Sequence, residues 1–262
     1  MTRVLMEVRG AAFKYAANAI FEALDLDVSA GEVLTVLGAN GCGKSTLLRC
    51  LAGTLNLSAG SVRVDGEELT GLDSTARARK VAILFQEHQV TFPFSALDIV
   101  TMGRTPYLSA FGSPSAQDRE AAAQALEEFG LLQVKDRAYT ELSGGERQLV
   151  LLCRTIVQRP AVILLDEPTA HLDFKNQVRC LDMIGRLAGR GVAIVSTSHD
   201  PNHAFLFPGR ALLMQRNRSV AIGPPSEIIN RASLAATYGI EVGVFCVERP
   251  APAKKLTFCS PW

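Results

Sequence analysis

Gly38-Ala39-Asn40-Gly41-Cys42-Gly43-Lys44-Ser45-Thr46 is the stretch that decides the fold of this 262-residue chain. An apolar run at 33–37 leads into it, and apolar residues at helical spacing follow at 47–51, which predicts a strand, a glycine-rich loop and a helix. Glycines let successive backbone N–H groups converge on phosphate oxygens, because no Cβ stands in the way. Lys44 adds a positive charge for the β- and γ-phosphates, and the Ser45 hydroxyl is suited to binding Mg²⁺. We therefore predict a phosphate-binding loop rather than a chance glycine turn.

The composition indicates one sizeable core and argues against several classes of protein. The 27 basic and 26 acidic residues give a net charge of +1 without a dense Lys/Arg block, so a nucleic-acid-binding stripe is not expected. No stretch approaches the ~18 uninterrupted apolar residues of a membrane span, and Glu7 comes too early for a signal peptide. The six cysteines (42, 50, 153, 180, 246 and 259) form no Cys-x-x-Cys pair, which favours reduced thiols.

Strand and helix patterns alternate along most of the chain, which predicts a parallel sheet in an α/β domain. Strands are expected at 3–9, 24–28, 61–67, 81–85, 161–165, 192–196, 211–215 and 219–222, and a helix at 176–188. A loop carrying Phe13 and Tyr15 is expected to separate the first two strands.

Helical patterns replace strand patterns at about 87–158, which indicates a helical subdomain inserted in the core. The clearest helix starts with a capping box at Ser115 and Asp118 and ends at Gly130. We expect one domain at 1–250, which contains this insertion, and a frayed, proline-rich tail at 251–262.

A second motif is an apolar strand that ends in two carboxylates, Asp166 and Glu167. At the carboxyl end of a strand beside a phosphate loop, Asp166 would hold Mg²⁺ and Glu167 would act as general base for an attacking water. Taken alone, a solvated turn before Pro168 explains the pair equally well. The phosphate loop in the same chain favours the catalytic interpretation.

A third motif, Ser143-Gly144-Gly145, opens a helix that continues through apolar residues. A hydroxyl and two glycine N–H groups at a helix N-terminus make a second anion site. One nucleotide cannot easily use both sites in one protomer. The motif therefore predicts a symmetric pair of subunits, in which each second site closes over the partner's γ-phosphate.

Together with Gln86 and the later Ser198-His199-Asp200, these motifs occur in the order found in one family. From about residue 6 to 244 the sequence resembles the nucleotide-binding subunit of ATP-binding-cassette (ABC) transporters. The resemblance implies an α/β fold with a P-loop NTPase core, in which a RecA-like parallel sheet is joined by an N-terminal antiparallel β part and an inserted helical subdomain. It also implies an ATPase that uses ATP and Mg²⁺ and is coupled to transport.

The resemblance also implies roles for single residues. Tyr15 would stack on adenine, with Phe13 as a rival. Gln86 would contact Mg²⁺ or the lytic water, His199 would bind the γ-phosphate and orient that water, and Asp173 would lie in the loop that crosses the dimer seam. The alternative for Tyr15 is an ordinary half-buried tyrosine. The alternative for Gln86 is a polar residue that ends a strand, and the alternative for His199 is a solvated loop histidine. The implied nucleotide-binding set is Tyr15, Gly38, Asn40, Gly41, Cys42, Gly43, Lys44, Ser45, Thr46, Ser143, Gly144, Gly145 and Asp173. The implied Mg²⁺ ligands are Ser45, Gln86 and Asp166, and the implied catalytic residues are Glu167, His199, Lys44 and Gln86.

The segments at 91–100, 102–107, 200–204 and 238–242 are similar to those of importers for metal chelates such as iron-siderophore, haem and cobalamin. That group implies a homodimer of ATPase subunits on the cytoplasmic face of the inner membrane. It further implies separate permease subunits docked near 87–110 and a substrate-binding protein, with no nucleic acid. An amphipathic core-and-surface stretch is the alternative for 91–107. A non-transport ABC ATPase acting in DNA repair or translation is the alternative function.

Two features depart from the family pattern or add to it. Residues 216–218 read Arg-Asn-Arg where the family usually has glycine. Cys42 lies inside the phosphate loop, at a helix N-terminus whose charge is expected to lower the pKa of the thiol. Alkylation of Cys42 would then inhibit the protein, and ATP would protect it.

Overall fold

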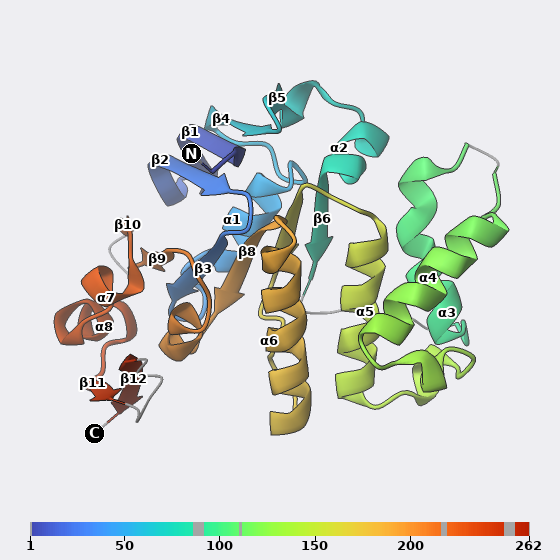
Figure 1. Ribbon diagram of the computed structural model, residues 1–262. Helices are drawn as coiled ribbons and strands as arrows, with labels where there is room; N and C mark the ends of the chain where they lie inside the picture. Colours follow the sequence, from blue (N-terminus) through green and yellow to red (C-terminus); the bar gives the residue numbers. More distant parts are fainter. Residues whose placement is uncertain (1, 86–91, 110–111, 216–218, 249–254, 262) are drawn as a thin grey trace.

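The computed structural model describes residues 2–85, 92–109, 112–215, 219–248 and 255–261 (Figure 1). Its strands are β1 (Val4–Tyr15), β2 (Asn18–Ser29), β3 (Val33–Gly38), β4 (Ala59–Val64), β5 (Glu67–Glu68), β6 (Val81–Leu84), β7 (Val162–Leu165), β8 (Ala193–Ser198), β9 (Ala211–Met214), β10 (Val220–Gly223), β11 (Val242–Glu248) and β12 (Lys255–Pro261). Its α-helices are α1 (Lys44–Leu51), α2 (Ser74–Lys80), α3 (Ala96–Thr101), α4 (Ala116–Glu128), α5 (Gly144–Val157), α6 (Phe174–Gly189), α7 (Pro225–Ile228) and α8 (Arg231–Tyr238). Among the described helices, none combines the length and the apolar character needed to cross a membrane.

A six-stranded sheet in the order β10-β9-β3-β8-β7-β6 forms the centre of the molecule. The five strands from β9 to β6 run parallel, and β10 pairs antiparallel at the edge. Alternate residues of β7 face opposite sides: Ile163 and Leu165 belong to one hydrophobic cluster, and Val162 and Leu164 to the other. Since both faces are covered, the strands are continuous apolar runs. The predicted α/β fold with a parallel sheet is confirmed.

A four-stranded sheet in the order β2-β1-β4-β5 is the antiparallel part implied by the family resemblance, and it too is confirmed. The predicted loop carrying Phe13 and Tyr15 is wrong, because β1 continues to Tyr15. The pairing of β1 with β2 shifts register between Val8 and Ala11, on either side of Gly10 at φ +57°. Such a bulge breaks the alternation of apolar residues, so the sequence pattern hides the second half of the strand.

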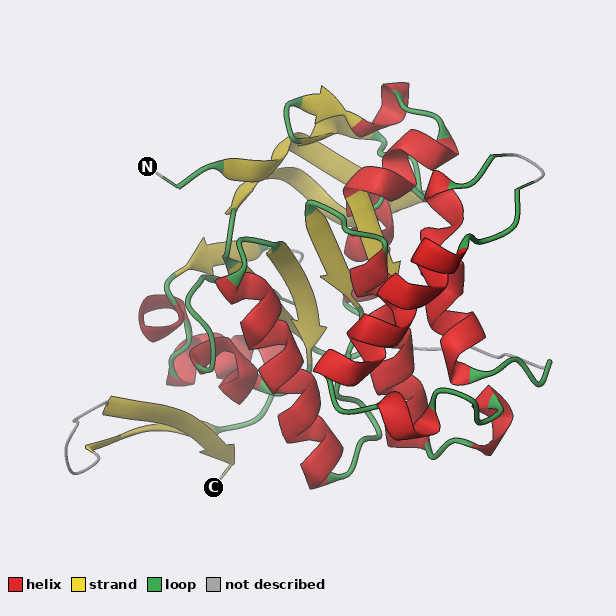
Figure 2. Ribbon diagram, turned by 45° about the vertical axis from the view of Figure 1, so that its right-hand side comes forward, coloured by secondary structure: helices red, strands yellow, loops and turns green. Residues whose placement is uncertain are grey.

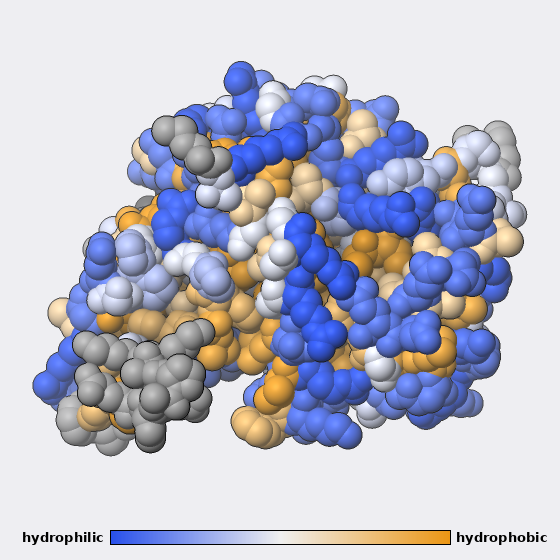
Figure 3. All heavy atoms as spheres, in the orientation of Figure 1, coloured by the Kyte–Doolittle hydropathy of each residue, from blue (hydrophilic) through white to orange (hydrophobic). Residues whose placement is uncertain are grey.

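Between β6 and β7 the chain forms helices α3, α4 and α5, which share one hydrophobic cluster with one face of the large sheet. Figure 2 shows the strands and a group of helices side by side. The predicted capping box of α4 is present: Ser115 accepts a hydrogen bond from the Asp118 N–H, and the Asp118 carboxylate accepts from the Ser115 N–H. Helix α6 covers the sheet beside α5. Figure 3 shows hydrophilic residues on much of its outer face, while Phe174 and Val178 in its first turns are exposed hydrophobic residues.

The frayed tail predicted at 251–262 is wrong for residues 255–261, while 251–254 and 262 lie outside the described residues. Strand β12 pairs antiparallel with β11 along seven residues, and Phe245 stacks on Phe258 at 5.4 Å between ring centroids. The Asn202 side chain adds two hydrogen bonds to the backbone of Cys259. Pairing with a distant strand therefore orders a segment whose prolines indicated disorder.

Asp118 anchors the start of α4, and its ionisation should make stability depend on pH. Arg104 Nε donates to Asp118 Oδ1 at 2.9 Å, and Ser115 donates to Oδ2 from both its hydroxyl and its N–H. The Arg104 bond and then the Ser115 bonds lower the pKa of Asp118 from its ordinary value of 3.8 to about 2. Because the folded pKa lies below the unfolded one, this stabilisation is present above about pH 4 and is lost as pH falls toward 2.

We therefore expect Asp118→Asn to lower the free energy of unfolding at pH 7, with the difference from wild type narrowing between pH 4 and pH 2. Urea unfolding at a series of pH values measures this. Asp182→Asn is the control, because Asp182 pairs with Arg186 on an exposed helix face, where an ion pair contributes little. If the difference in free energy of unfolding between Asp118→Asn and wild type stays constant down to pH 2, the charge of Asp118 does not stabilise the fold.

Candidate active site

The carboxyl ends of β3, β7 and β8 meet at one edge of the large sheet, because parallel neighbours end on the same side. The phosphate-loop motif follows β3, the carboxylate pair follows β7 and His199 follows β8. A cavity of about 530 Å³ opens beside them. It is lined by Tyr15, Ile20, Asn40, Gly41, Gly43, Lys44, Ser45, Thr46 and Glu167.

Two glycines of the loop are required by their surroundings. Gly43 precedes α1 with φ +107°, and a Cβ there would lie 2.2 Å from Ile20 Cγ2. At Gly38 a Cβ would lie 2.5 Å from Cys42 Sγ and 2.8 Å from a backbone oxygen of β9. The loop can therefore keep its backbone close to β2 and β9 only with glycine at both positions.

The expectation of a lowered pKa for the Cys42 thiol is wrong. Burial raises the pKa of Cys42, and the nearby charge of Lys44 offsets that effect only in part. A helix N-terminus lowers a thiol pKa where the thiolate remains solvated, whereas this side chain is half-buried.

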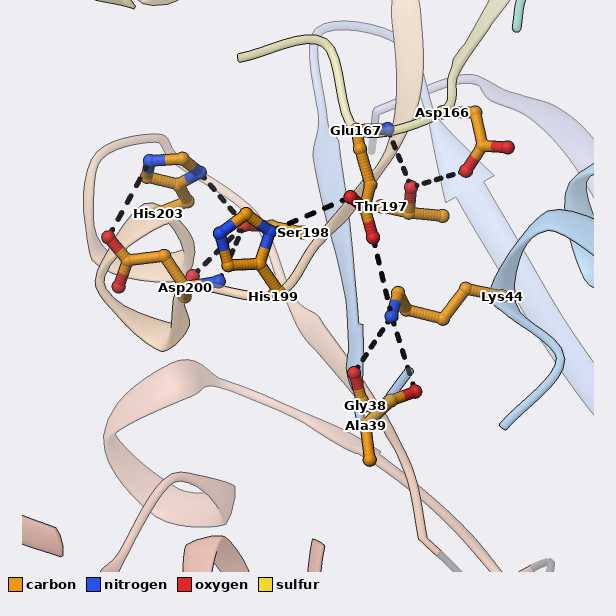
Figure 4. Close-up of polar contacts among 10 residues, drawn as sticks. All are labelled: Gly38, Ala39, Lys44, Asp166, Glu167, Thr197, Ser198, His199, Asp200 and His203. Atoms are coloured by element: carbon orange, nitrogen blue, oxygen red, sulfur yellow. Dashed lines mark hydrogen bonds and ion pairs between the residues drawn. The ribbon is translucent and has the colours of Figure 1, made fainter. Parts of the chain in front are cut away.

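Lys44 is 6% exposed and curls back over the start of the loop (Figure 4). Its Nζ donates to the carbonyl oxygens of Gly38 at 2.8 Å and Ala39 at 3.4 Å. The same Nζ lies 3.5 Å from Glu167 Oε1. A buried ammonium group at the wall of the cavity, held by two carbonyls and a carboxylate, can be transferred to an incoming phosphate over a short distance.

The carboxylates after β7 differ in environment. Asp166 is 4% exposed, whereas Glu167 faces the cavity and lies 3.6 Å from His199 Nδ1 through its Oε2. Glu167 has φ +48°, a left-handed conformation that residues other than glycine rarely adopt. Such strain is concentrated at functional sites, where the surroundings hold it in place.

Thr197 was not singled out from the sequence, yet it joins the two carboxylate residues. Its hydroxyl donates to Asp166 Oδ1 and accepts from the Glu167 N–H, both at 2.8 Å (Figure 4). The available signal was a run of hydroxyl residues at the end of an apolar strand, which reads as an ordinary exit from the core.

Comparison with known proteins identifies the family. The family described as ABC transporter matches residues 21–170, which is more than half of the chain. The chain belongs to the ABC transporter family. It is therefore an ATP-binding subunit whose ATPase activity is coupled to transport, and its large sheet is the core of an ABC cassette.

Relatives and solved structures match the cassette over nearly its whole length. It is 35% identical over 253 residues to a hemin import ATP-binding protein, HmuV, of Rhodococcus jostii (strain RHA1), which covers 97% of this chain and 85% of the relative. The HmuV protein of Pseudomonas entomophila (strain L48) is 37% identical over 243 residues, with 91% and 94% covered. An inward-facing ABC transporter assigned to the metal-chelate type superposes with a TM-score of 0.88 at 31% identity, with 99% and 98% covered.

In this ABC cassette the two aromatic candidates for adenine contact lie differently. Tyr15 is 48% exposed and lines the cavity. Phe13 is 7% exposed, packs edge-on against Tyr15 and stacks against Phe21. Burial therefore removes Phe13 as a surface for a ligand and leaves Tyr15.

The Ser143, Gly144 and Gly145 segment opens α5, and none of its residues lines the cavity of this cassette. Ser143 caps α5 through a capping box with Glu146. A Cβ on Gly145 would lie 2.2 Å from Asn176 Nδ2 of α6, the helix that Asp173 caps. Helices α5 and α6 both begin at the lower side of Figure 1, toward which β6 also points. Gln86 lies outside the described residues.

Proposed function

We propose that this chain is the ATP-hydrolysing subunit of an importer for metal chelates, of which haem is the favoured example, and that it acts through a separate membrane permease. The similarity to hemin import ATP-binding proteins over more than nine-tenths of the chain carries the proposal. The metal-chelate type transporter, which superposes along almost the whole chain, supports it.

In this proposal the cavity binds ATP. The exposed ring of Tyr15, which lines the cavity, offers a face on which adenine can stack. Backbone N–H groups of Gly41 and Gly43 and the N-terminus of α1 bind the phosphates. Lys44 exchanges its contacts with the Gly38 and Ala39 carbonyls for β- and γ-phosphate oxygens.

The residues present fit Mg²⁺, which would neutralise charge on the phosphates. Mg²⁺ prefers oxygen ligands and is held by one or two carboxylates together with phosphates and water. The Ser45 hydroxyl and the Asp166 carboxylate are such ligands, and Gln86 is a third candidate outside the described residues. Within the described part of the chain, no three His, Cys, Asp or Glu side chains form the denser cluster typical of other metal sites.

Glu167 is proposed as the general base that accepts a proton from the attacking water. Its carboxylate faces the cavity and lies between Lys44 Nζ at 3.5 Å and His199 Nδ1 at 3.6 Å. Once Lys44 turns to the phosphates, the carboxylate is released to bind water. His199 is 60% exposed in its side chain, so it can reach the γ-phosphate and orient that water.

The position of the second anion site supports a head-to-tail homodimer. Ser143, Gly144 and Gly145 do not line the cavity of their own protomer. A partner subunit related by a two-fold axis can present its own copy of this segment to the γ-phosphate, with Asp173 at the seam. The subunit pair would lie on the cytoplasmic face of the inner membrane, with permease subunits docked near 87–110 and a substrate-binding protein outside.

Purification from native membranes through a tag on this chain tests the proposal. The complex is expected to contain an integral membrane permease and, in proteoliposomes, to transport haem with ATP hydrolysis, compared with a ferric siderophore and cobalamin. A chain that copurifies with ribosomes or DNA and without a membrane protein would instead favour a non-transport ABC ATPase. Transport of another chelate but not of haem would support the proposed importer function and show that haem is not the substrate.

A further inference from the structure

Thr197 occupies a central position at the end of β8. Strand β8 lies between β3, which leads into the phosphate loop, and β7, which leads into the carboxylates. In the register of these strands Thr197 lies opposite Val36, and Ser196 lies opposite Leu165. One residue further along β8 and β7, Thr197 therefore lies beside Asp166. Thr197 is 0% exposed, so its hydroxyl is a polar group in the interior.

Both hydrogen-bonding functions of this hydroxyl are engaged. The oxygen accepts the Glu167 N–H at 2.8 Å, and the single hydroxyl proton is donated to Asp166 Oδ1 at 2.8 Å. A hydroxyl has only one proton to give, so the direction of both bonds is fixed. Thr197 therefore links the side chain of one carboxylate residue to the backbone of the other.

The two bonds restrain the Asp166 carboxylate and the backbone from which the Glu167 side chain extends. Figure 4 shows the second oxygen of Asp166 turned away from Thr197. The bond to Oδ1 limits rotation of the carboxylate and leaves that second oxygen for an ion. The bond to the N–H of Glu167 secures a peptide at φ +48°, from which the Glu167 side chain extends toward Lys44 and His199.

We propose that Thr197 is a positioning residue for ATP hydrolysis, which holds the Asp166 carboxylate and the Glu167 backbone in one arrangement through a single hydroxyl. The inference rests on the roles proposed above for Asp166 and Glu167. Side chains that hydrogen-bond to a metal ligand or to a general base fix the orientation of that group. Removing such a side chain typically lowers metal affinity or activity by about 10–100-fold.

Two substitutions separate the hydroxyl from the methyl group. Thr197→Val keeps the shape and removes the hydroxyl, whereas Thr197→Ser keeps the hydroxyl and removes the methyl group. With Thr197→Val, kcat is expected to fall by about 10–100-fold, with little change in KM for ATP. Thr197→Ser is expected to retain kcat. Should Thr197→Val not fold, Thr197→Ala replaces it in the comparison with Thr197→Ser.

A second measurement does not depend on turnover. In the Glu167→Gln background, electron paramagnetic resonance measures binding of Mn²⁺, used in place of Mg²⁺, to the ATP complex. Adding Thr197→Val is expected to weaken Mn²⁺ binding by about 10-fold or more, and adding Thr197→Ser is not. Equal behaviour of the two variants in kcat and in Mn²⁺ binding would overturn the inference, because a purely structural threonine does not distinguish them in this way.

The outcomes also separate this inference from the proposed function. An inactive Glu167→Gln together with a fully active Thr197→Val overturns only the role of Thr197. A Glu167→Gln variant with wild-type hydrolysis overturns the base on which the inference rests.

Discussion

Glu167→Gln is expected to lower kcat for ATP hydrolysis by about 10²–10⁴-fold, the range that a positioned general base contributes. Glutamine keeps the shape of the side chain but cannot accept a proton from water. ATP binding should survive, because the loop, Lys44 and Tyr15 are untouched. Removing the carboxylate 3.5 Å from Lys44 Nζ also frees this cation for the phosphates, so the affinity for ATP should be unchanged or higher.

Three measurements on one preparation check this result. They are steady-state Mg-ATPase activity, equilibrium binding of a fluorescent ATP analogue, and oligomeric state by light scattering with and without ATP. The variant is expected to form an ATP-dependent dimer, because trapped nucleotide keeps the seam closed. Glu120→Gln, the same change on an exposed position of α4, is the control. Hydrolysis at the wild-type rate would rule out Glu167 as the base.

The sequence predicts the core of this site well because its signals are local. An apolar run, a glycine loop and a helical pattern follow one another within 33–51, and each is decided by neighbouring residues. The carboxyl ends of parallel strands meet at one edge whatever the loops between them do. The placement of Lys44, Asp166, Glu167 and His199 at one edge of the sheet therefore follows from the order of strands alone.

What the sequence could not predict depends on distant contacts. Burial raises the pKa of Cys42, and this burial depends on neighbours from other segments of the chain. The sequence around Cys42 shows only the helix N-terminus, which on its own predicts a lowered pKa. The hairpin of β11 with β12 needs two strands to meet, and neither segment alone has a clear pattern. The role of Thr197 depends on the register of β7 against β8, which apolar runs do not specify.

Ser143→Glu, introduced in the Glu167→Gln background, is expected to abolish the ATP-dependent dimer and leave ATP binding by the monomer unchanged. In the proposed head-to-tail pair the Ser143 side chain would face the partner's γ-phosphate, and a carboxylate there would repel it. Like charges brought together at an interface cost several kcal/mol, so the association constant should fall roughly 100-fold or more. Light scattering across an ATP titration measures the dimer, and the fluorescent analogue measures binding.

Ser115→Glu is a closely matched control. Ser115 caps α4 with the same capping box that Ser143 makes on α5, with Asp118 in place of Glu146. Each substitution removes a serine cap, which typically costs about 0.5–2 kcal/mol of stability, and adds one negative charge. Helix capping alone therefore predicts similar losses of stability and no effect on the dimer from either variant. Only a role of Ser143 at the partner's nucleotide predicts that the dimer is lost in one variant and kept in the other. If the Ser143→Glu and Ser115→Glu variants dimerise equally, the second anion site does not lie at the dimer seam.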